Sequence, residues 1–177
     1  MLDRMARLTP HFRLGELIPP DCTEVPPWVL GELTDLAAEL LEPIRVHFNG
    51  PLVIHDAYRP PEHNDRVGGV KGSDHLDGKA ADFHVTGSLD SDWQERTMQA
   101  FHWARVALAG RYGQVILEDH REALKNPGKL WVHISTPSGK HPGTGHDANA
   151  VLVSLEPRRY MPYAEAVTEE AHGSASP

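Results

Sequence analysis

Two short apolar segments of this chain each carry a polar side chain that a hydrophobic core does not tolerate alone. Asp82 lies within residues 79–85, and His133 lies within residues 130–135. Burying an unpaired carboxylate is costly, so a fold that buries both segments has to bring partners to these side chains. The nearest candidate partner is His75, seven positions before Asp82.

Together the three side chains have the composition of a metal site. Two histidines and one carboxylate, with a fourth position left to water, form the ligand set of a catalytic zinc ion. Each residue also has an ordinary alternative: His75 as a surface histidine of a glycine-rich loop, and His133 as a core histidine bonded to backbone. The combination favours one Zn²⁺ held by His75, Asp82 and His133.

Hydrolysis at such a metal needs two further groups. One is a carboxylate that takes a proton from the attacking water. The other is a cation that binds either the oxyanion developing on the substrate or a carboxylate of the substrate. Glu118 is the candidate base because it ends an apolar strand, with Asp119 as its competitor. Its ordinary interpretation is a solvated acid at a strand end. Arg59 is the candidate cation, since Pro60 and Pro61 fix it and a guanidinium suits a carboxylate. The alternative is a surface arginine.

The periodicity of apolar residues predicts an α+β fold. Helices are expected over 28–47, where Pro43 should kink or divide the helix, and over 90–110, with Ser91 as a plausible N-cap. Strands are expected over 51–58, 79–85, 112–118, 130–135 and 150–155, and the strands at 112–118 and 130–135 should form an antiparallel pair. Residues 1–155 form the expected domain, and 156–177 form a polar C-terminal extension, disordered or used for docking.

Composition excludes several classes of site. The 17 basic and 25 acidic residues give a net charge of −8, which argues against nucleic-acid binding. Cys22 is the sole cysteine, so neither an internal disulfide nor a cysteine-rich zinc site can form. No run is long enough for a membrane span, and the N-terminus lacks the apolar core of a signal peptide. We expect synthesis in the cytoplasm and an action elsewhere that depends on delivery.

At these residues the chain resembles the zinc D-Ala-D-Ala metallopeptidases, which include D,D-carboxypeptidases, D,D-dipeptidases and phage L-alanyl-D-glutamate endopeptidases. The family motif Ser-x-His-x-x-x-Gly-x-Ala-x-Asp is matched by Ser73, His75, Gly78, Ala80 and Asp82. A later Trp-x-His element is matched by Trp131 and His133, and an upstream element by residues 58–61. The resemblance covers about residues 9 to 137 and is strongest to the short, phage-associated branch.

The resemblance implies a hedgehog-like fold: a small antiparallel sheet with helices packed on one face and the zinc site on the sheet. It implies zinc ligation by His75, Asp82 and His133, and substrate contacts from Arg59, Ser73 and Trp131. One position departs from the family. Several members carry their catalytic acid three residues before the second histidine, where this chain has Leu130. The short branch tends to end a strand in Glu, which places the base at Glu118.

The function predicted is hydrolysis of peptidoglycan stem peptides by a zinc-dependent D-Ala-D-Ala carboxypeptidase or endopeptidase. A phage or prophage wall-degrading protein is expected, either an endolysin or part of a virion. The alternative is a non-catalytic zinc module of the same fold, a virion or tail component that docks to wall peptide or to phage proteins through residues 156–177. A metallohydrolase of small molecules is a third possibility that residue types alone leave open.

Overall fold

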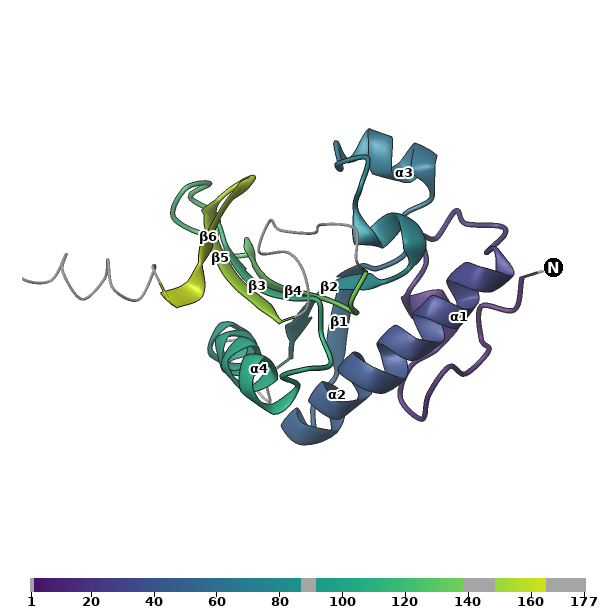
Figure 1. Ribbon diagram of the computed structural model, residues 1–177, viewed down its shortest axis with the longest axis horizontal. Helices are drawn as coiled ribbons and strands as arrows, with labels where there is room; N and C mark the ends of the chain where they lie inside the picture. Colours follow the sequence, from purple (N-terminus) through teal and green to yellow (C-terminus); the bar gives the residue numbers. More distant parts are fainter. Residues whose placement is uncertain (1, 87–91, 139–148, 165–177) are drawn as a thin grey trace, which may run out of the picture.

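A six-stranded sheet forms the centre of the computed structural model, which describes residues 2–86, 92–138 and 149–164 (Figure 1). The strand order is β1-β2-β4-β3-β5-β6. Their bounds are β1 Leu52–Asp56, β2 Ala80–Val85, β3 Gln114–Asp119, β4 Leu130–Ser135, β5 Ala150–Glu156 and β6 Arg159–Pro162. The predicted α+β class and the antiparallel pairing of β3 with β4 are confirmed.

The sheet differs from the expected antiparallel arrangement at one pair, because β3 and β5 run parallel. The path of the chain gives the reason. β4 ends at Ser135, which lies level with Gln114 at the start of β3, and β5 begins at Ala150, which also lies level with Gln114. After β4 the chain therefore passes the N-terminal end of β3. The next strand, β5, pairs with the other edge of β3 and runs in the same direction as β3.

The helices include α1 (Pro27–Leu36), α2 (Glu42–Phe48), α3 (Pro61–Arg66) and α4 (Trp93–Ala107). Residues Ala37–Leu41, labelled η2, form a π-helical turn between α1 and α2. Pro43 has no backbone N–H to close an ordinary turn onto the carbonyl four residues earlier, and the wider turn accommodates it. The predicted effect of Pro43, a kink or a division of the helix, corresponds to this π-helical turn, which separates α1 from α2 without interrupting the helical path.

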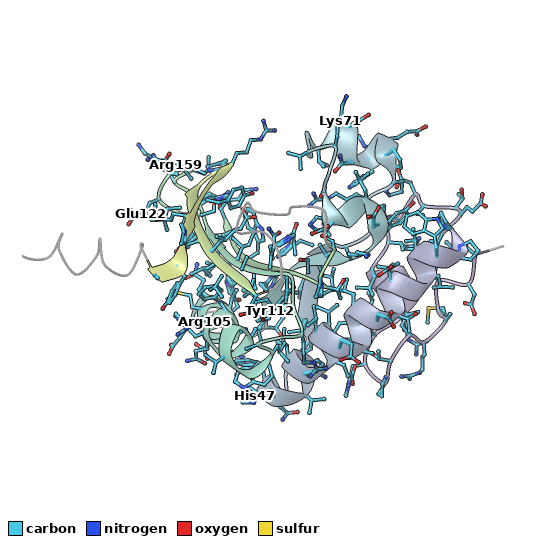
Figure 2. All side chains as sticks on the ribbon, viewed as in Figure 1. His47, Lys71, Arg105, Tyr112, Glu122 and Arg159 are labelled. Atoms are coloured by element: carbon cyan, nitrogen blue, oxygen red, sulfur yellow. The ribbon has the colours of Figure 1, made fainter. Side chains whose placement is uncertain are left out.

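The hydrophobic core lies between one face of the sheet and the layer formed by α1, α2 and α4, while α3 projects on the other side (Figure 1). Alternation along β2 and β4 sends Ala81, Phe83, Val132 and Ile134 into this core, where all four are fully buried. Side chains fill the layer beneath the sheet (Figure 2), and the hydroxyl of Tyr112 there donates to the Arg105 carbonyl at 2.9 Å. The intervening residues of β2 and β4 face the opposite, open side of the sheet.

The sheet extends beyond residue 155, where sequence reasoning ended the domain. β5 continues to Glu156, and β6 pairs antiparallel with it through Val153 and Met161. Part of the expected extension is therefore an edge strand. The remainder of that segment, 165–177, lies outside the described residues, as do Ser91 and the loop histidines His141 and His146. No helix within the described ranges is long and apolar enough to cross a membrane.

Candidate metal centre

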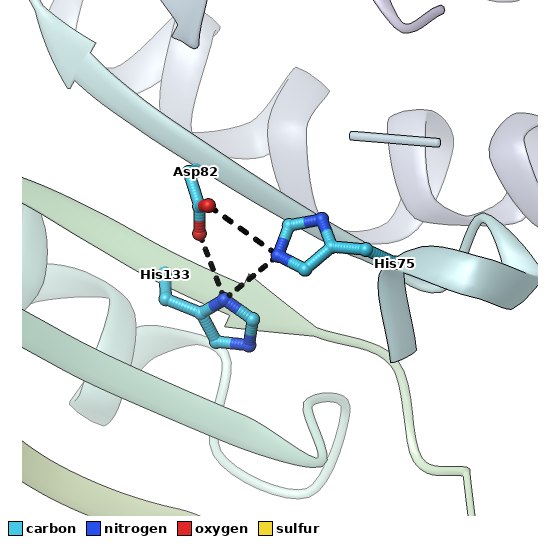
Figure 3. A group of neighbouring side chains, drawn as sticks. All are labelled: His75, Asp82 and His133. Carbon is cyan, nitrogen blue, oxygen red and sulfur yellow. Dashed lines mark hydrogen bonds and ion pairs between the residues drawn. The ribbon is translucent and has the colours of Figure 1, made fainter. Parts of the chain in front are cut away.

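The register of β2 and β4 places Asp82 directly opposite His133. On the open face of the sheet, the Nδ1 atom of His133 lies 2.8 Å from Oδ1 of Asp82 (Figure 3). Both residues are largely buried, with 8% and 9% of their surfaces exposed. The two polar side chains that interrupt apolar strands thus become partners of each other.

His75 reaches the same point from η3, the short 3-10 helix Asp74–Asp77. The Nδ1 atom of His75 donates a hydrogen bond to the carbonyl oxygen of Ala57 at 2.8 Å. This bond occupies Nδ1, so Nε2 is the ring nitrogen that faces the site, and it lies 3.4 Å from Oδ2 of Asp82 and 3.3 Å from Nδ1 of His133. A backbone carbonyl commonly orients a metal-binding histidine in this way.

Two residues shape the turn that carries His75. The Ser73 hydroxyl accepts a hydrogen bond from the His75 backbone N–H at 3.4 Å and begins η3. Gly78 ends it with φ of +71°, and a Cβ there would lie 3.0 Å from Val29 and 3.1 Å from Leu33. Glycine is needed because other residues rarely adopt this conformation and because helix α1 packs against the turn. The Ser73 hydroxyl thus contacts backbone, and its contact with substrate stays a prediction.

The three side chains fit a zinc ion. Their ligand atoms all lie within 4.8 Å of one another. Zinc bonds of about 2.0–2.2 Å in tetrahedral geometry separate neighbouring ligand atoms by about 3.3 Å. The two histidine nitrogens are 3.3 Å apart, and the two Asp82 oxygens lie 2.8 Å from His133 Nδ1 and 3.4 Å from His75 Nε2, respectively. Within the described part of the chain, this is the one group of three or more acidic, histidine or cysteine residues arranged to hold a metal.

The charges of these side chains suit the binding of a metal cation. Burial alone raises the pKa of the Asp82 carboxyl, but the charge of His75 and the hydrogen bond from His133 hold it well below its usual range. For His133, burial lowers the pKa, but the hydrogen bond to Asp82 outweighs it and the net pKa is raised. In the metal-free protein this pair shares a proton that a metal ion would displace.

Arg59 is tied to the same carboxylate. Its Nη2 lies 2.8 Å from Oδ2 of Asp82, and its Nε lies 2.5 Å from Oδ2 of Asp56. Its backbone N–H donates to the carbonyl oxygen of His75 at 2.9 Å. The side chain is only 16% exposed, so it is held beside the ligands rather than free at the surface.

Glu118 lies on the open face of β3, and 8% of its surface is exposed. Burial, mainly, and the charge of Asp82 raise the pKa of its carboxyl, while His133, Arg59 and Tyr160 oppose the increase, and the net pKa is about 7. An acid with this pKa can accept and release a proton at neutral pH, as a catalytic base must.

The competing acid and the other predicted positions lie as follows. Asp119 forms an ion pair with Arg121, with Nη2 and Oδ2 2.6 Å apart. Trp131 lies opposite Glu118 in the sheet, and its ring meets the edge of His120 at a centroid distance of 5.1 Å. The structure thus brings Glu118 and Arg59 to the three ligand candidates and directs Asp119 to Arg121. The roles of all these residues stay predictions.

Sequence reasoning missed Tyr160, His120 and Asp56. Asp56 follows an apolar strand and precedes Arg59 by three residues, a spacing that could have indicated an ion pair. His120 lies two positions after Glu118, on the same side of the extended chain. Tyr160 lies in the polar C-terminal segment, where no sequence pattern pointed to the site.

The fold and the His–Asp–His group define a metallopeptidase-like architecture. The family model described as Peptidase M15 matches residues 21–115, more than half of the chain. The chain therefore belongs to this family, the zinc D-Ala-D-Ala metallopeptidases, and is a metallopeptidase by descent. The match includes Arg59, His75 and Asp82 and ends before Glu118 and His133. No curated protein matches the chain.

Proposed function

We propose that this chain is a zinc-dependent peptidase that hydrolyses the stem peptides of peptidoglycan, as a D,D-carboxypeptidase or an endopeptidase. The observation that carries the proposal is the position of Glu118, a buried acid with a pKa of about 7, on the same sheet face as the His–Asp–His group. A metal-binding module without activity has no need of such an acid.

Zinc, when bound by His75, Asp82 and His133, would supply a Lewis acid and lower the pKa of a coordinated water to about 7. The carboxylate of Glu118 accepts the proton of the attacking water and delivers it to the nitrogen of the departing amine. In the metal-free protein its pKa of about 7 allows the group to change its protonation state at little cost near neutral pH.

Arg59 binds the substrate carboxylate or the developing oxyanion. Two of its five guanidinium N–H groups bond to Asp56 and Asp82, which fixes the plane of the side chain. The other N–H groups are donors for an anionic group of the substrate. A terminal D-alanine carries such a carboxylate, and this supports a carboxypeptidase; an endopeptidase would use the same donors on the peptide oxygen.

The test is digestion of purified peptidoglycan, with the released fragments identified by mass. The wild-type protein loaded with zinc should release D-alanine or shorter stem peptides. Glu118→Gln should keep its zinc and lose activity by about 10²–10⁴-fold, whereas the matched variant Asp119→Asn should remain active. Wild-type turnover by Glu118→Gln would refute the assignment of the base.

The same digestion addresses the alternative of a non-catalytic wall-binding or virion module. That protein would sediment with peptidoglycan and release no fragments at any zinc concentration. The phage setting, as endolysin or virion component, belongs to this proposal and is supported by the resemblance to the short, phage-associated branch. Action at the bacterial wall and docking to phage tail proteins through residues 156–177 are likewise proposed.

A further inference from the structure

His55 and His84 form a pair of histidines on the open face of the sheet, outside the His–Asp–His group. His84 follows Asp82 by two positions on β2, and alternation along the strand directs both side chains to that face. His55 lies on the neighbouring edge strand β1, where the register with β2 shifts between Ile54 and Asp56. His55 is therefore the extra residue of a β-bulge, and its side chain turns toward β2.

The two imidazole rings meet across these strands. The Nδ1 atom of His84 lies 2.8 Å from Nε2 of His55, and the ring centroids are 4.8 Å apart. One of these nitrogens donates to the other, so a single proton is held between them. A divalent metal ion can replace this proton, because each ring can carry its remaining proton on its other nitrogen.

The rings need to move very little to hold an ion. Two nitrogen ligands of one tetrahedral zinc ion lie about 3.3 Å apart, so the observed separation has to increase by only about 0.5 Å. The ring of Trp93, at the start of α4, lies 5.1 Å from that of His84 and restricts its movement. His55 is exposed, so its ring is free to make the adjustment, and an ion can reach the pair from solvent.

The pair is too far from Asp82 to share the metal of the His–Asp–His group. Residues two apart on a strand are separated by about 7 Å, whereas the two ions of a bridged metal centre lie about 3.5–4 Å apart. Among the described residues, no third histidine, cysteine or acidic side chain completes the pair into a larger group. Water would supply the other ligands, and binding should be weaker than at a site with three protein ligands.

We propose that His55 and His84 form a second binding site for a divalent transition metal such as Zn²⁺, separate from the predicted catalytic ion. Imidazole nitrogens are ligands that suit zinc, copper and nickel. The ion would join the edge strand β1 to β2 at the bulge, where the ladder of backbone hydrogen bonds is interrupted. This site does not depend on the peptidase function proposed above.

The test is equilibrium dialysis of chelator-treated protein against increasing free Zn²⁺, with the zinc per chain measured by elemental analysis. The wild type should take up one ion tightly and a further ion more weakly. His55→Gln and His84→Gln should each keep the tight ion and bind the weaker one at least about 10-fold less well, since even the loss of a group that only orients a ligand costs this much.

His102→Gln is the matched control, because this exposed histidine lies against Phe101 and Tyr163 at α4, away from the pair. It should bind both ions as the wild type does. Asp82→Asn should show the reverse pattern of the two pair variants, with the tight ion weakened and the weaker ion kept.

A wild type that saturates at one zinc ion would overturn the proposal. So would a weaker ion whose affinity is unchanged in His55→Gln, because that ion would be bound elsewhere on the chain. The result with His55→Gln decides the matter even if His84→Gln fails to fold, since His55 is exposed and lies at a bulge, where a glutamine is readily accommodated. Retention of the tight ion in His55→Gln confirms that the variant is folded.

Discussion

Glutamine in place of Glu118 should stabilise the metal-free protein at high pH, although it removes the proposed base. Burial holds the pKa of Glu118 at about 7 in the folded protein, against 4.5 for an unperturbed glutamate. The folded state therefore binds this proton more tightly than the unfolded chain does. Its contribution to stability is fully present below pH 4.5 and is lost as the pH rises through about 7.

The structure sets the size of this effect. A pKa difference of about 2.5 at about 1.4 kcal/mol per unit corresponds to roughly 3.5 kcal/mol once the pH is well above 7. Above pH 7 the wild-type protein bears this cost because it buries an ionised carboxylate, and an uncharged glutamine does not. The free-energy advantage of Glu118→Gln over the wild type should therefore grow by about 3 kcal/mol between pH 4.5 and pH 8.

Urea unfolding in the presence of a chelator measures this advantage at several pH values. The titrating groups that do not interact with Glu118 are common to both proteins, so their effects cancel in the difference. Glu122→Gln, at an exposed position, controls for the loss of one negative charge. If the stability difference between Glu118→Gln and the wild type were the same at pH 5 and pH 8, Glu118 would not be buried as described, and its role as a base tuned by burial would fail.

Four further predictions concern the metal and its surroundings. Asp82→Asn should lose most of its zinc, measured by elemental analysis, because a neutral amide cannot replace an anionic ligand; full occupancy would refute the ligand assignment. Arg59→Lys should keep zinc and lower kcat/KM about 10- to 100-fold, since an ammonium cannot span both aspartates and the substrate; unchanged kinetics would place substrate binding elsewhere. Chelation should lower the melting temperature by roughly 5–10 °C relative to protein at a free zinc concentration of about 100 times Kd, and an unchanged value would mean that the folded chain holds no zinc. Gly78→Ala should lower the free energy of unfolding by about 1–2 kcal/mol, owing to its φ of +71°; a neutral effect in urea unfolding would contradict the strain.

The grouping of the predicted ligands could be inferred because the sequence places two of them where they need partners. Asp82 and His133 interrupt strands whose other residues are apolar, and the cost of burying them alone demanded a shared partner. The same reasoning located Pro43 as the break in a long helix, because the missing N–H is a local property. Such inferences need only the chain itself.

The extent of the sheet was harder to infer. The parallel pairing of β5 with β3 and the addition of β6 depend on where the chain goes after Ser135, and local pattern carries no information on that path. Strand β6 is short and polar, so it lacks the apolar alternation that reveals a buried strand. The segment after residue 155 consequently read as an extension, and Tyr160 was not considered for the site.

By itself, the sequence determined which residue types would meet at the centre: two histidines, a carboxylate, an arginine and one further acid. Only the tertiary structure decided how they meet. Strand register sets Asp82 opposite His133, and the Ala57 carbonyl turns Nε2 of His75 toward both. The physical reason is that composition fixes what must be paired, whereas register and packing, which join residues distant in the chain, fix the partner.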